Sequence, residues 1–60
     1  MKRIGNKLKE LRKLNKLTLK DVGLRLGVDT SLISRWENDE RQPGNNQLME
    51  LAEIFGVSFN

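Results

Sequence analysis

Four polar side chains within one short stretch can donate or accept hydrogen bonds, and none of them is acidic: Thr30, Ser31, Ser34 and Arg35. Ile33 and Trp36 follow helical spacing in the same stretch, so a helix there would bury them and turn the polar four outward. Such donors and acceptors match the base edges in the major groove of duplex DNA. Arg35 is the strongest candidate, because its guanidinium fork fits O6 and N7 of guanine.

Leu32 lies at the margin of this polar face. Its side chain would either contact the methyl group of a thymine or fill a gap beside the preceding helix. The alternative interpretation of the four polar residues is that they are ordinary surface residues that contact only solvent. Trp36 is assigned to the core rather than to base stacking, because of its spacing from Ile33. The stretch therefore predicts a base-reading helix over residues 30–38.

A second predicted helix, over residues 18–26, precedes this reading helix. Thr18 is a typical N-cap residue, and Asp21, three residues later, completes a variant of the capping box. Gly27 supplies the left-handed position at which helices commonly end, and Val28 supplies the apolar contact that follows it. Both ends of this helix are therefore marked in the sequence.

The connection between the two helices is very short, because Asp29 is already a candidate N-cap for the reading helix. Two short helices joined by so tight a turn meet at a steep angle, which is the helix-turn-helix arrangement. Gly23 fits this arrangement, since a larger side chain there would push the second helix away from the third.

Two further helices complete the predicted bundle, one over about residues 3–15 and one over about residues 45–55. Each has apolar residues on one face: Ile4, Leu8, Leu11 and Leu14 in the first, and Leu48, Leu51, Ala52 and Phe55 in the last. A fifth helix would start near Ser58. No segment shows the alternation of period two that strands require. Residues 1–60 thus predict one all-α domain, a compact bundle of four or five short helices.

The amino-acid composition excludes several classes of function. The chain has 60 residues with no cysteine and no histidine, so we expect no disulfide, no metal site and no nucleophile–base pair for catalysis. No apolar run forms a signal peptide or approaches the about 20 residues of a membrane span. We therefore expect a cytoplasmic protein that is not an enzyme and has no cofactor, membrane or small-molecule partner.

Positive charge is concentrated near the amino terminus. Residues 1–20 hold eight basic side chains and one acidic one, whereas residues 21–40 hold two basic and five acidic ones. A basic segment suits a polyanion, since each neutralised phosphate releases counterions, although a solvated helix face would carry the same charges.

Asn45 and Asn46 also have two interpretations: they attract phosphate at the start of the last helix, or they cap it.

Four segments carry a more specific pattern: Ile4-x-x-x-Leu8-Lys9-x-Leu11-Arg12, Leu26-Gly27-Val28, Ile33-Ser34-Arg35-Trp36-Glu37-Asn38 and Leu51-Ala52-x-x-Phe55-Gly56-Val57. Together they resemble the lambdoid phage repressor and Cro family, whose members carry the Xre-type helix-turn-helix domain. The similarity covers residues 4–59. It implies a lambda repressor-like fold and a transcriptional regulator, most often a repressor, that binds specific sequences of double-stranded DNA with the helix over 30–38.

The resemblance also implies roles for individual residues. In this family the residues matching Thr30, Ser31 and Arg35 touch bases. The residues matching Thr18 and the loop from Arg41 to Asn46, which includes Asn45, hold phosphates.

A structural ion pair is implied as well, between Glu37 and an arginine of the first helix, here Arg12. That pairing removes Arg12 from the expected DNA contacts. Leu19 stands where many members have a phosphate-binding glutamine, so we assign that contact to Lys20 or Thr18.

Two other positions depart from the family pattern. Gly23 stands where alanine is usual, which lowers helix propensity by up to about 1 kcal/mol. Asp39 stands where glycine commonly ends the third helix, and aspartate tolerates the left-handed conformation better than most residues.

Members of this family usually bind as homodimers to inverted repeats whose half-sites lie about one helical turn apart. We expect a homodimer here on an inverted-repeat operator, with Met49, Val57 and Phe59 near the self-association surface. We also expect the chain to be a piece of a longer regulator, with a natural small protein as the alternative. The alternative function is a helical protein-interaction module, or an antitoxin-type regulator that also binds a protein partner. A module of that kind predicts an exposed apolar patch.

Overall fold

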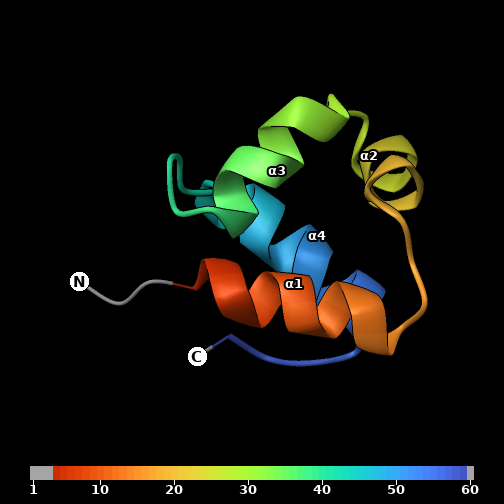
Figure 1. Cartoon of the computed structure of the whole chain (residues 1–60). Coiled ribbons are helices and arrows are strands. Elements are labelled where there is room, and N and C mark those ends of the chain that lie inside the picture. Colours follow the sequence, from red (N-terminus) through yellow and green to blue (C-terminus); the bar gives the residue numbers. More distant parts are fainter. Residues whose placement is uncertain (1–3, 60) are drawn as a thin grey trace.

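The computed structural model describes residues 4–59, which form a bundle of four helices (Figure 1). Their bounds are Gly5–Leu14 for α1, Leu19–Leu26 for α2, Thr30–Glu37 for α3 and Asn45–Phe55 for α4. The described range contains no strand, so the all-α prediction is confirmed. Residues 57–59 are not helical, so the fifth helix expected near Ser58 is not formed there. The predicted start at residue 3 lies outside the described residues.

All four helices contribute to one apolar core, formed by Leu8, Leu11, Val22, Ile33, Trp36, Leu51 and Phe55. Val22, Trp36 and Leu51 are its most deeply buried members. Because α3 packs against both α1 and α2, it is held from two sides. Between residues 4 and 59, no helix is long and apolar enough to cross a lipid bilayer.

The prediction that Leu14 belongs to the core is wrong. It was assigned to the apolar stripe of the first helix, but its side chain is 79% exposed. Successive residues turn by about 100° around a helix, so Leu14 lies well to one side of the line through Leu8 and Leu11. The inward position in the last turn belongs to Arg12, whose side chain is only 12% exposed.

The turn between α2 and α3 depends on two glycines. Gly27 has a φ of 71°, and the amides of Gly27 and Val28 both donate to the Gly23 carbonyl, at 2.8 and 3.0 Å. A Cβ at Gly23 would lie 2.8 Å from the Val28 carbonyl oxygen and 3.6 Å from the Ile33 side chain. The predicted need for a small residue is therefore confirmed, and the closest neighbour is the backbone of the turn rather than the side chains of α3.

A second close approach, between α1 and α3, was not anticipated from the sequence. A Cβ at Gly5 would lie 2.3 Å from the Glu37 carbonyl oxygen and 2.8 Å from that of Trp36. The first residue of α1 thus lies directly against the last turn of α3. Only glycine allows this separation, because any side chain would meet backbone atoms that cannot rotate away.

Candidate nucleic-acid interface

The outward side of α3 carries the polar residues named above: exposed Thr30, Ser31 and Arg35, and half-buried Ser34. On the opposite side, Ile33 is 3% exposed and Trp36 is 2% exposed. Rotation of α3 would bring these two side chains into water, so the fold determines which face is presented. Leu32 is half-buried and packs against the core, which leaves only part of its side chain outside.

Asp29 occupies the N-cap position of α3 with extended backbone, at φ −69° and ψ 145°. Its side chain makes no capping hydrogen bond, so the predicted position is right but the capping bond is not formed. An exposed carboxylate therefore lies at the start of α3.

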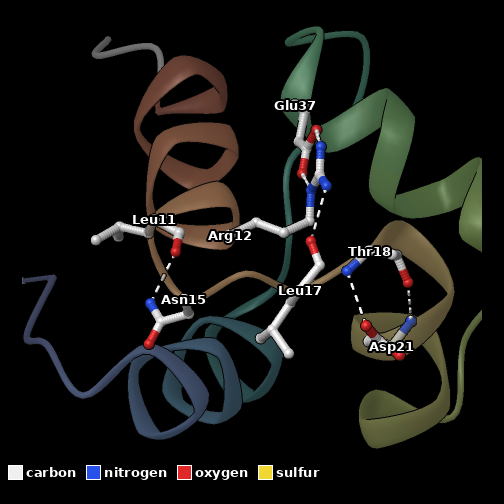
Figure 2. A network of polar contacts seen from close by, with 7 residues as sticks. All are labelled: Leu11, Arg12, Asn15, Leu17, Thr18, Asp21 and Glu37. Carbon is white, nitrogen blue, oxygen red and sulfur yellow. Dashed lines mark hydrogen bonds and ion pairs between the residues drawn. The ribbon is translucent and has the colours of Figure 1, made fainter.

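Thr18 and Asp21 form the capping box of α2 (Figure 2). The Asp21 amide donates to Thr18 Oγ1 at 3.0 Å, and the Thr18 amide donates to Asp21 Oδ2 at 2.9 Å. The bond from the Thr18 amide is the main cause of a lowered pKa of Asp21, whose ordinary value is 3.8; the Thr18 side chain and the Arg25 and Lys20 charges lower it further.

Arg12 joins three parts of the chain (Figure 2). Its Nε lies 2.7 Å from Glu37 Oε2, and its Nη2 donates to Glu37 Oε1 at 3.2 Å. Its Nη1 donates to the Leu17 carbonyl at 3.0 Å, one residue before the N-cap of α2. The Arg12 and Glu37 side chains are 12% and 7% exposed. The expected pair is therefore present in the structure, and each of the three guanidinium nitrogens donates to the protein.

The other candidate phosphate ligands are exposed side chains on separate segments: Lys20 in α2, Arg41 in the loop after α3, and Asn45 and Asn46 in the first turn of α4. That loop folds back on α3, because the Glu40 and Arg41 amides both donate to the Arg35 carbonyl, at 2.9 and 3.3 Å.

At the start of α4, the Gly44 amide donates to Gln47 Oε1 at 2.8 Å. Gln47 thus supplies the side-chain bond at this end of the helix. Asn45 and Asn46 make no such bond among the described residues, and their side chains face solvent.

Asp39 has an unexpected contact. Its φ of 61° matches the left-handed conformation expected at that position, and its Oδ1 accepts a hydrogen bond from the Gly5 amide at 3.0 Å. Ile4, the N-cap residue of α1, makes no side-chain capping bond, so Asp39 acts as the cap from 34 residues away. Neither Gly5 nor Asp39 carries a periodic or motif signal that would have linked them.

A shallow apolar groove of about 670 Å³ lies along α4 and the segment after it. Its lining includes the apolar residues Leu48, Met49, Ala52, Val57 and Phe59, together with the charged Glu53. Met49 is 68% exposed and Val57 is 36% exposed. The groove includes all three residues that the sequence assigned to a self-association surface.

Comparison with known proteins agrees with this geometry. A family model described as helix-turn-helix matches residues 8–60. The chain is 31% identical over 55 residues to the HTH-type transcriptional regulator ImmR of Bacillus subtilis (strain 168), a match that includes 92% of this chain. The chain spans 43% of the length of that relative.

Proposed function

This chain belongs to the helix-turn-helix family, and we propose that it is the DNA-binding part of a transcriptional regulator that reads the major groove with α3. One observation carries the proposal. The exposed side of α3 is polar and free of acid, while the buried Ile33 and Trp36 hold the opposite side in the core. A helix presented in this way offers hydrogen-bonding groups to base edges without bringing a carboxylate against them.

Arg35 is the proposed main source of specificity. Its exposed guanidinium can bind O6 and N7 of a guanine together, a pair worth about 1–3 kcal/mol of discrimination. Thr30 and Ser31 at the start of α3 are short, and we propose that their hydroxyls contact neighbouring bases. Half-buried Ser34 and Leu32 are proposed to contribute less, since Leu32 already packs on the core.

We propose that phosphate contacts position the domain on the duplex. Thr18 and Lys20 supply them from the start of α2, where both side chains are exposed. Arg41 supplies one from the loop after α3, and Asn45 and Asn46 supply others from the amino-terminal end of α4. Contacts of this kind are independent of base sequence and determine the register of the protein on DNA.

A homodimer on an inverted repeat is part of the proposal. A single module of this type buries only about 600–1,000 Å² of protein surface on DNA, so binding two half-sites together raises affinity and specificity. The apolar groove on α4 supports self-association, because Met49 and Val57 are exposed there. A bound dimer would exclude other proteins from its operator, which is the simplest route to repression.

The experiment is a fluorescence-anisotropy titration of labelled duplex DNA with the protein over a series of salt concentrations. The logarithm of the binding constant should fall linearly with the logarithm of salt, by about 0.9 for each phosphate contact. Selection from a random duplex library should then yield a half-site that contains a guanine. Binding that does not change with salt would refute the proposed function.

A further inference from the structure

The loop that follows α3 is tied to α1 by a side chain. Asp39 accepts a hydrogen bond from the Gly5 amide at 3.0 Å, and this bond is partly buried. Gly5 is also the residue whose missing side chain lets α1 reach the carbonyls of Glu37 and Trp36. The end of α3 and the beginning of α1 therefore form one contact, with the Asp39 carboxylate as its polar part.

The same loop is tied to α3 by its backbone. The Asp39 amide donates to the Trp36 carbonyl at 3.2 Å, and the Glu40 and Arg41 amides donate to the Arg35 carbonyl. Residues 39–41 are thus held by α1 on one side and by α3 on the other. The exposed Arg41 side chain leaves from this doubly held segment, two residues after the α1 contact.

Electrostatics alone would make Asp39 weaken DNA binding. A carboxylate close to a phosphate contact repels the DNA backbone, so its removal would raise affinity. Here the carboxylate accepts from the first amide of α1, where the positive end of the helix dipole offsets part of its charge. Glycine would adopt the same backbone angle more readily but could not form this bond.

We propose that Asp39 is a positioning residue for Arg41: its bond to Gly5 holds the loop so that the Arg41 guanidinium meets a DNA phosphate. The inference rests on the proposed function, because it assumes that Arg41 binds phosphate. It assigns Asp39 no direct contact with DNA. The residue acts through the backbone of the loop and improves binding although its charge opposes it.

The test compares five proteins by anisotropy on one mixed-sequence duplex over a salt series: wild type, Asp39→Gly, Arg41→Ala, the double variant Asp39→Gly/Arg41→Ala, and the charge control Glu40→Gln. Arg41→Ala should reduce the salt slope by about one. Asp39→Gly should weaken binding several-fold and reduce the salt slope by nearly as much as Arg41→Ala does. The double variant should be no weaker than Arg41→Ala, because positioning has no effect once the guanidinium is gone. Glu40→Gln should raise affinity through charge alone.

The inference would be overturned if Asp39→Gly left the salt slope unchanged. It would also be overturned if Asp39→Gly raised the affinity for DNA as much as Glu40→Gln does. Asp39→Asn is the matched variant, since it removes the same charge as Asp39→Gly but keeps an acceptor oxygen for the Gly5 amide. Positioning predicts that Asp39→Asn keeps the wild-type salt slope and binds more tightly than Asp39→Gly. Equal binding and equal slopes for these two variants would refute it. Wild-type binding that does not respond to salt would instead refute the proposed function itself.

Discussion

Arg12 and Glu37 form a bidentate ion pair that joins the last turn of α1 to the last residue of α3, with N–O distances of 2.7 and 3.2 Å. The same guanidinium binds the Leu17 carbonyl, so one side chain connects α1, α3 and the segment before α2. The pair therefore contributes to the orientation of α3 relative to the start of α2. Both of these elements are proposed to meet DNA.

Removal of one partner from this pair should be costly. Glu37→Leu leaves the Arg12 guanidinium mostly buried and without its carboxylate, a situation that typically costs about 3–5 kcal/mol. A domain of this size has only about 3–9 kcal/mol of stability, at roughly 0.05–0.15 kcal/mol per residue. Urea unfolding followed by circular dichroism should show the loss. The double variant Arg12→Met/Glu37→Leu should recover much of it, and equal losses in both proteins would contradict this account.

Gly5→Ala should destabilise the fold although alanine favours helices. The added Cβ would lie 2.3 Å from the Glu37 carbonyl oxygen, so α1 must move away from α3. We expect a loss of about 1–3 kcal/mol, the usual cost of overpacking. The neighbouring Asn6→Ala is the matched control, since Asn6 is exposed in the same helix and should be nearly neutral or slightly stabilising. A Gly5→Ala protein as stable as the control would show that α1 can shift freely.

Arg35→Ala and Arg41→Ala should weaken DNA binding in different ways. Loss of Arg35 should relax selection at one base-pair position, with a change of about 1–3 kcal/mol at that position and little effect on non-specific binding. Loss of Arg41 should lower affinity for all sequences alike. Binding-site selection with each variant separates the two roles. Uniform weakening by Arg35→Ala would make Arg35 a phosphate contact instead.

The capping box predicts an acid-labile contribution to stability. Because folding lowers the pKa of Asp21, the folded state favours its charged form. The stabilisation is present above the ordinary pKa of 3.8 and is lost as pH falls through the lower folded value. Thermal unfolding between pH 6 and pH 2 should therefore show a gap between wild type and Asp21→Asn that closes towards low pH. A gap that stays constant over this range would show that the ionised carboxylate is not responsible.

Self-association should depend on the groove along α4. Met49→Lys places a charge among apolar side chains that a partner would cover, so sedimentation equilibrium should show at least tenfold weaker association. Binding to a single half-site should remain, while the advantage of the inverted repeat should disappear. Ser31→Ala, on α3, is the control that should leave association unchanged. If Met49→Lys associates like wild type, the dimer forms through another face.

Local signals in the sequence predicted most of the fold. The four helices, the capping box of Thr18 and Asp21, and the glycine ending at Gly27 all rest on residues within a few positions of one another. The need for a small residue at Gly23 could also be predicted, because the tight turn that follows it is visible in the sequence. These features follow from chain geometry over one or two helical turns.

The contacts between distant segments were harder to predict. Leu14 was placed in the core because its spacing from Leu11 is helical, although the last turn of α1 instead directs Arg12 inward. The bond between Asp39 and Gly5 joins residues 34 apart, and neither side of it has a characteristic pattern. The Arg12–Glu37 pair was expected only because the chain resembles a known family. Long-range polar contacts depend on how whole helices dock, which spacing along one helix does not determine.

The division of α3 into a buried side and an outward side has a consequence for how such regulators diversify. Among residues 4–59, the side chains of Thr30, Ser31 and Arg35 take part in none of the hydrogen bonds or ion pairs that hold the helices together. On the proposed function, substitutions there would change the preferred operator while Ile33, Trp36 and the rest of the core stay as they are. The domain would then be a scaffold on which new target sequences are acquired in single mutational steps, without a prior gain in stability.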